Sequence, residues 1–317
     1  MSNRIQQSSV ARLRFRRLWY YLLIGAACVQ ALHGQTNSDP HAALADLRSD
    51  YLEAISKISG LIFRNLTPTE QSVFDQIDIR VPLSDDPTIA RALPPRNGVR
   101  PIEISVGHIR ALEMIVDAAV VREFKGQPRF LQEYIEYILS RWDVNRGRYL
   151  QGLSPLRIQN PFEFGHLSDR QADQIREYRG KTSGAAFYNA LSFLLAHEVG
   201  HHMLGHPGHV PESLADSRSR ERDADDWATH ILLRNGGNPL AGLYVLVFHF
   251  VQTDGGLKGE LNSTHPADVR RIKAMYQSVR NDQTGLRYLA RSLGVSAQDL
   301  AIQIDGQIAN VDSEMHR

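Results

Sequence analysis

One short segment constrains this chain more than any other: residues 191–209 read LSFLLAHEVGHHMLGHPGH. Its leading leucines recur at helical spacing, so we expect a helix with one buried face that ends before Pro207. His197 and His201 are four residues apart and therefore project from the same side of that helix. Two imidazoles placed in this way can bind one zinc ion, and the neighbouring carboxylate of Glu198 can act as a general base.

A catalytic zinc ion needs a third protein ligand and an open fourth position for water. The segment SRERDADDWATHILL, residues 219–233, supplies the candidate. Glu221 and Asp225 stand four residues apart on one face of a predicted helix. Glu221 can bind the zinc ion, and Asp225 can accept the free ring N–H of a histidine ligand. An acidic cluster is by itself more simply a solvated helix face, but its place downstream of H-E-x-x-H favours one zinc ion per chain on His197, His201 and Glu221.

Three further histidines follow the motif: His202, His206 and His209. A metzincin site, with three histidine ligands, needs Gly three residues and His six residues after the second histidine of the motif. Leu204 and Pro207 occupy those two places. The spacing therefore excludes that type of site, and we interpret His206 as a structural or rim residue and not as a ligand.

The N-terminal segment differs in composition from the rest of the chain. Five arginines precede the first acidic residue, Asp39, and an apolar run occupies residues 18–29. This pattern predicts a secretory signal within residues 1–34, with an uncleaved anchor or lipidation at Cys28 as the alternatives. We therefore expect an exported protein, periplasmic or secreted, that touches a membrane only through this segment. Over the whole chain, the charges of 36 basic and 35 acidic side chains nearly cancel, which argues against nucleic acid as a partner.

The spacing of apolar residues predicts a predominantly helical α+β chain with a small sheet. A proline-rich stretch between the two strand candidates is expected to be an irregular connection. Residues 145–183, rich in Gly, Pro, Asn and Arg, are expected to form a long loop with one short helix. The expected helices are at 41–66, 108–124, 128–144 and from 185 onward, and the expected strands are at 76–81 and 101–106.

Together these segments resemble the zinc metallopeptidases of family M forty-eight, the CAAX-prenyl-protease and heat-shock-protease type, within the gluzincins. That family carries H-E-x-x-H, often with a further histidine five residues later, where His206 stands. Its E-x-x-A-D and S-x-H-P…Arg-Ile motifs are matched at Glu221, Ala224, Asp225, Ser263, His265, Pro266, Arg271 and Ile272. The resemblance implies a zincin-like peptidase domain with its H-E-x-x-H on the active-site helix. It also implies the zinc ligands and base named above, and places His265 near the active site as a catalytic residue that stabilises the tetrahedral intermediate.

The motifs span about a quarter of the chain, and the family's glycine-rich approach to a substrate-aligning edge strand is not found ahead of them. The best candidate for that strand and the helix after it is PIEISVGHIRAL, residues 101–112. This segment lies far upstream of His197, which implies an insertion between them. The expected division is 1–34 as signal or anchor, 35–100 as a helical and linker region, and 101–317 as the peptidase domain, with an inserted segment near 127–185.

The expected function is that of a zinc-dependent endopeptidase acting on peptides or unfolded proteins, in processing or quality control of envelope proteins. Metal-activated water would attack the peptide bond, with Glu198 as general base. The alternative is a catalytically silent zinc-binding envelope protein that binds peptides or a partner. Such a protein would keep the zinc ligands but could dispense with Glu198, so the presence of this residue favours the enzyme.

Overall fold

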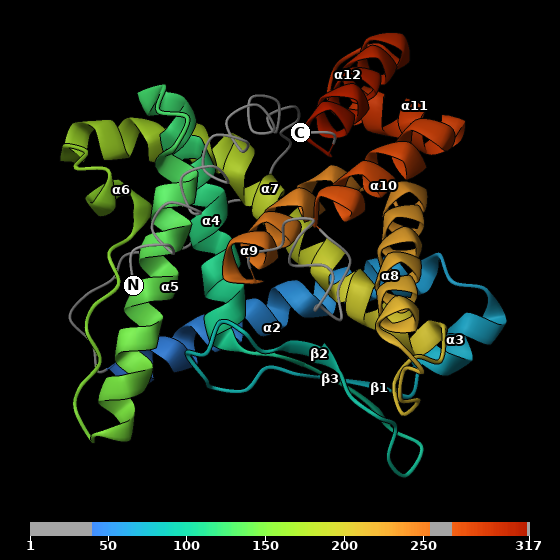
Figure 1. Cartoon of the computed structure of the whole chain (residues 1–317), viewed down its shortest axis with the longest axis horizontal. Coiled ribbons are helices and arrows are strands. Elements are labelled where there is room, and N and C mark those ends of the chain that lie inside the picture. The colour runs from blue at the N-terminus through green and yellow to red at the C-terminus, as the bar shows by residue number, and fades with distance from the viewer. Residues whose placement is uncertain (1–39, 254–267, 316–317) are drawn as a thin grey trace.

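The computed structural model describes residues 40–253 and 268–315, which form a mostly helical structure with a small sheet (Figure 1). This confirms the predicted α+β class. The elements are α2 (Pro40–Arg64), α3 (Pro68–Phe74), β1 (Ile77–Arg80), β2 (Ala90–Ala92), β3 (Arg100–Ile104), α4 (Val106–Lys125), α5 (Phe130–Leu150), α6 (Pro161–Phe164), α7 (Asp169–Met203), α8 (Leu214–Arg234), the 3₁₀ helix η2 (Pro239–Gly242), α9 (Leu243–Thr253), α10 (Asp268–Asn281), α11 (Gln283–Ser292) and α12 (Ala297–Met315).

The sheet has the strand order β1-β3-β2, so β3 is its central strand. β1 runs parallel to β3, with Ile79 opposite Ile102, and β2 runs antiparallel to β3, with Ala92 opposite the same Ile102. The two strands predicted from alternation are therefore present as β1 and β3. Because β3 is paired on both sides, only β1 and β2 form edges of this sheet.

The proline-rich stretch contains a strand, β2, and its interpretation as wholly irregular is wrong. A bridge between Arg96 and Val99 closes the β2–β3 hairpin. The two residues at its tip, Asn97 and Gly98, have φ angles of 52° and 77°. Two consecutive positive φ angles are typical of a type I′ turn, for which Asn-Gly is the strongest sequence signal. That dipeptide predicts the hairpin even though β2 itself has only three residues.

The expected long loop at 145–183 is also wrong, because most of this stretch is helical. Its first residues continue α5, α6 lies in its middle, and α7 begins at Asp169. The Ser168 hydroxyl accepts from the Gln171 backbone N–H while the Gln171 side chain accepts from the Ser168 N–H, which is a capping box. The start of α7 has a mostly polar sequence, in which Ala172 and Ile175 are buried. The hydrophobic period is therefore weak there, and the capping box is the better signal.

The helix α7 positions the site. It runs diagonally through the middle of the molecule, packs against α4, and has its C-terminal end beside α8 (Figure 1). Leu191, Leu195 and Val199 of α7 are fully buried, which anchors this part of the helix in the core. Within the described residues, no helix has the length and apolar character that crossing a bilayer requires.

A buried histidine in α4 makes stability depend on pH. His108 Nδ1 donates to the Pro87 carbonyl at 2.6 Å. Burial lowers the pKa of His108 to about 4, although the Pro87 carbonyl opposes this shift. The unfolded chain, with a pKa near 6.5 at this residue, takes up a proton first as pH falls. Stability contributed by the neutral side chain is thus present above pH 6.5 and lost as pH falls towards 4.

We expect the free energy of unfolding to fall between pH 7 and pH 5 by about 2 kcal/mol more in the wild type than in His108→Gln. Glutamine is neutral at both pH values and can still donate to the Pro87 carbonyl. Urea unfolding at the two pH values measures the difference. An equal loss in both proteins would contradict the assignment of this pH dependence to His108.

Candidate metal centre

The H-E-x-x-H motif lies in the last turns of α7, as its spacing predicts. His197 is 8% exposed, and the side chains of His197 and His201 point at the same spot, with their Nε2 atoms 3.1 Å apart. Glu221 reaches this spot from α8. Its Oε2 lies 3.5 Å from His197 Nε2, and its Oε1 lies 3.5 Å from His201 Nε2. The structure thus brings together all three predicted ligands, which come from two helices.

Close packing of α7 and α8 makes this arrangement possible. A Cβ atom on Gly200 would lie 3.2 Å from Trp227 Cε3 and 3.3 Å from the Ala224 carbonyl oxygen. Ala224 and Ala228 are themselves fully buried. Small residues on both helices therefore let the two backbones approach closely, one turn away from the facing donor atoms.

The donor atoms fit a metal ion in both chemistry and spacing. Two imidazoles and one carboxylate are a usual protein ligand set for zinc. Donor atoms about 2.05 Å from a tetrahedrally bound metal stand about 3.3 Å from one another. The two Nε2 atoms are 3.1 Å apart, and each lies 3.5 Å from a different oxygen of the Glu221 carboxylate. With one ligand atom taken from each residue, the three atoms lie within 4.8 Å of one another. In the described part of the chain this trio is a group that can hold a metal ion.

Asp225 stands behind His197, on the side away from the other donor atoms. Its Oδ1 lies 2.9 Å from His197 Nδ1. Arg271, from α10, donates to the same carboxylate from its far side. Asp225 is thus placed where an acceptor for the second ring nitrogen of a ligand histidine belongs.

Neighbouring charges and burial shift the pKa values of the side chains in this cluster. Burial lowers the pKa of His197, but the carboxylates of Asp225 and Glu221 outweigh burial and raise this pKa to about 10. Burial and the nearby His197 lower the pKa of His201 to about 3. Burial raises the pKa of Asp225, but the Arg271 guanidinium outweighs burial and lowers it to about 2. The lowered pKa of His201 leaves its ring neutral at neutral pH, whereas a metal ion that bound His197 Nε2 would have to displace a proton held there by the two carboxylates.

Residues 129–290 match the model of the peptidase U49 family. The matched region contains 162 of the 317 residues of the chain. The chain belongs to the peptidase U49 family. Its matched region holds the whole donor cluster together with Asp225 and Arg271, and it makes the chain a peptidase. The match does not extend to family M forty-eight in particular. No curated protein and no solved structure matches the chain.

In this U49 peptidase, Glu198 sits beside His197 in α7 and is only 6% exposed. It does not belong to the trio of donor atoms that face one another. The helix geometry that places His197 and His201 on one line turns Glu198 about 100° away from His197. A carboxylate in this position is next to the donor cluster without being part of it, which is the position predicted for the general base.

Two of the additional histidines have contacts that sequence spacing does not reveal. His206 Nδ1 lies 2.9 Å from His201 Nδ1. A neutral His201 with its proton on Nδ1 can donate to His206 and leave Nε2 free for a metal. His202, nearly fully buried, bonds through Nε2 to the Pro101 carbonyl oxygen at 3.0 Å. That bond ties α7 to the central strand β3.

The segment 101–112 does contain a strand and a following helix, but the strand is β3 and is not an edge. Its partners β1 and β2 occupy both of its sides, so its backbone cannot pair with a substrate. On the β2 side the chain comes close to the loop that follows α7, since a Cβ on Gly208 would lie 3.7 Å from Pro95 Cδ. Of the remaining family motif, His265, Ser263 and Pro266 lie outside the described residues.

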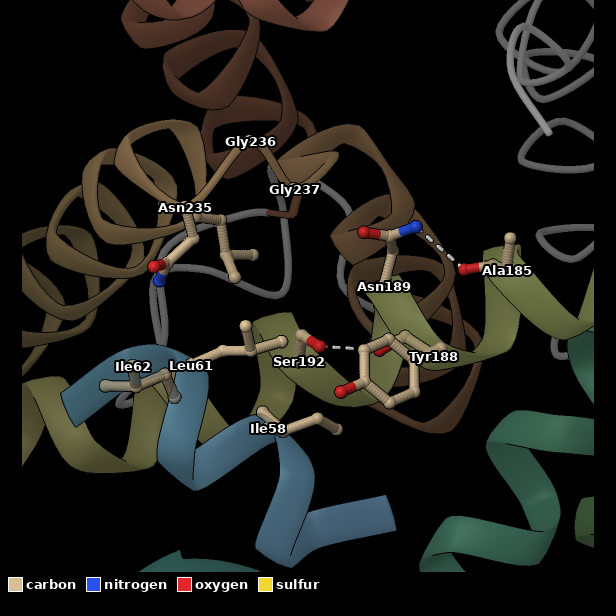
Figure 2. Close-up of a pocket in the computed structure, with 11 residues that line it drawn as sticks. Ile58, Leu61, Ile62, Ala185, Tyr188, Asn189, Ser192, Asn235, Gly236 and Gly237 are labelled. Atoms are coloured by element: carbon tan, nitrogen blue, oxygen red, sulfur yellow. Dashed lines mark hydrogen bonds between the residues drawn. The ribbon is translucent and has the colours of Figure 1, made fainter. Parts of the chain in front are cut away.

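A hollow of about 260 Å³ is bounded by α2, α7 and the turn after α8, and Figure 2 draws the residues that line it. Ile58 and Ile62 of α2 face Tyr188 and Ser192 of α7 across it, and the Ser192 hydroxyl donates to the Tyr188 carbonyl at 2.7 Å. The residues of the donor cluster do not line this hollow. The candidate metal centre of the U49 peptidase is therefore a separate place on α7.

Proposed function

We propose that this U49 peptidase is a zinc-dependent endopeptidase that holds one zinc ion on His197, His201 and Glu221. The observation that carries the proposal is the convergence of their donor atoms at a nearly buried point between two helices. The two Nε2 atoms lie 3.1 Å apart there, and each lies 3.5 Å from one oxygen of the Glu221 carboxylate. A surface cluster of polar side chains would not need this convergence. A tetrahedral ion with one open position needs three protein donor atoms that converge in this way.

A zinc ion bound there would supply Lewis-acid polarisation of the scissile carbonyl and a lowered pKa for the attacking water. Glu198 accepts the proton of that water on its carboxylate and passes it to the nitrogen of the leaving amine. Asp225 keeps a proton on His197 Nδ1, so that Nε2 of this ring faces the other donors. The low exposure of Glu198 and His197 limits access of bulk water to these groups.

The proposed substrate is a peptide or an unfolded protein segment that pairs in extended form with a sheet edge, since main-chain pairing recognises peptides of many sequences. β1 and β2 are the edges of the described sheet. We further propose that residues 1–34 export or anchor the protein, and that it processes or removes envelope proteins. The pattern of residues 1–34 alone supports this placement.

Removing the metal tests the proposal. We expect dialysis of the full chain against a chelator to take away about one zinc ion per chain and to abolish hydrolysis of a broad peptide library. Added zinc should restore hydrolysis and raise the melting temperature, since an ion at 100 times its Kd stabilises the folded state by about 2.7 kcal/mol. Metal analysis, a peptide-cleavage assay and thermal unfolding on one preparation measure all three.

The outcomes separate the competing functions. Zinc that binds and stabilises without any cleavage would favour the silent zinc-binding protein. Cleavage that survives complete removal of metal would contradict a zinc mechanism, because the described cluster would then be dispensable. Absence of zinc binding even after reconstitution would remove the basis of the proposal.

A further inference from the structure

Arg271 makes an unusual connection between α10 and the metal centre. It is 5% exposed, although arginine is among the residues that are almost never buried without a partner. Its Nε lies 2.7 Å from Asp225 Oδ2, and its Nη2 lies 2.8 Å from Asp225 Oδ1. The planar guanidinium thus engages both oxygens of one carboxylate, which is the most directional form of ion pair.

The same guanidinium also approaches the third donor residue. Arg271 Nη2 lies 3.8 Å from Glu221 Oε2, and that oxygen is the one that faces His197. Asp225 Oδ1 is likewise shared, because it accepts from Arg271 on one side and faces His197 Nδ1 at 2.9 Å on the other. The Arg271 guanidinium therefore lies near Glu221 directly and near His197 through the Asp225 carboxylate.

This geometry constrains the Asp225 carboxylate. A carboxylate held by one hydrogen bond can rotate about its Cβ–Cγ bond, because that torsion has a broad energy profile. Two parallel bonds from Arg271 remove the rotation and keep Oδ1 directed at His197. The orientation of the His197 ring then depends on a residue that does not touch it.

We propose that Arg271 is a positioning residue for the metal centre, acting through Asp225 on His197 and through its charge on Glu221. The inference rests on the proposed metal site. It assigns to α10 a part in metal binding, although α10 contributes no donor atom. Lysine cannot replace arginine here, since an ammonium group is a point charge without the planar pair of donors.

Arg271→Lys tests this role because it keeps the charge and removes the fork. We expect its zinc affinity, measured in the full chain by competition with a chromogenic chelator, to fall about 10–100-fold, the range found for residues that support metal ligands. The visible absorption bands of the cobalt(II)-substituted protein should shift, because they report ligand geometry. Arg270→Lys, at the exposed neighbouring position, is the matched control and should leave both quantities unchanged.

A double variant separates positioning from general destabilisation. If Arg271 acts through Asp225, then Arg271→Lys should weaken zinc binding less than about threefold once Asp225→Asn is already present. Equal weakening in both backgrounds would overturn the proposal. So would wild-type zinc affinity and an unchanged cobalt spectrum in Arg271→Lys. A wild-type chain that binds no zinc would instead overturn the proposed function, and this inference with it.

Discussion

Glu198→Gln is expected to lower the rate of peptide hydrolysis by about 10²–10⁴-fold, the usual contribution of a general base, with zinc still bound at one ion per chain. Glutamine has nearly the same shape as glutamate, so it fits the largely buried position of Glu198. It cannot accept the proton of the attacking water. Because Glu198 lies outside the donor trio, zinc affinity should stay within about threefold of the wild type.

Steady-state hydrolysis of a cleaved peptide, with metal analysis of the same samples, measures both parts of this expectation. Glu212→Gln is a suitable control, since Glu212 is an exposed glutamate in the loop between α7 and α8. Unchanged hydrolysis by Glu198→Gln would show that another group takes the proton. Loss of zinc in this variant would instead mean that Glu198 supports the ligands directly.

Glu221→Gln is expected to weaken zinc binding by more than about 100-fold, because even residues that only support a ligand change metal affinity by about 10–100-fold. The change removes the negative charge that faces both histidines at 3.5 Å. Hydrolysis should fall in parallel with zinc occupancy and recover in part at high zinc concentration. Chelator competition and hydrolysis measured against free zinc concentration test this expectation.

Asp223→Asn provides the matched control for Glu221→Gln. It removes one acidic charge from the same helix at an exposed position two residues away. If both variants lost zinc equally, a general change in charge would explain the loss. If neither lost zinc, Glu221 would not be the third ligand, and the site would need another donor.

The candidate metal centre was predictable because the spacing of residues in a helix determines which side chains lie on the same face. Residues four apart lie on one face of a helix. The sequence alone therefore predicts two pairs of neighbouring side chains, His197 with His201 and Glu221 with Asp225. The approach of α7 to α8 was predictable only in part. Ala224 and Ala228 show that α8 permits close contact, and the Gly200 contact with Trp227 shows where it occurs.

Other contacts depend on tertiary packing, and no local pattern contains them. Arg271 is 46 residues from Asp225, and His202 is 101 residues from Pro101. The first half of α7 was missed for a different reason, since its sequence is largely polar and hydrophobic periodicity is a weak guide there. β2 was missed because three residues between prolines carry little strand signal, although the turn beyond them does.

The contact at Gly200 has a consequence for metal loading. Because a side chain at this position would meet Trp227 and Ala224 within 3.3 Å, backbone packing sets the distance between the two ligand-bearing helices. Small zinc-finger domains, by contrast, gain their fold from the ion itself and unfold without it. In this chain the long helices are held by packing in the hydrophobic core, so we expect the metal-free protein to keep its helical circular dichroism. Zinc would then enter a rigid, preassembled receptor, and its uptake would be a binding step without a folding step.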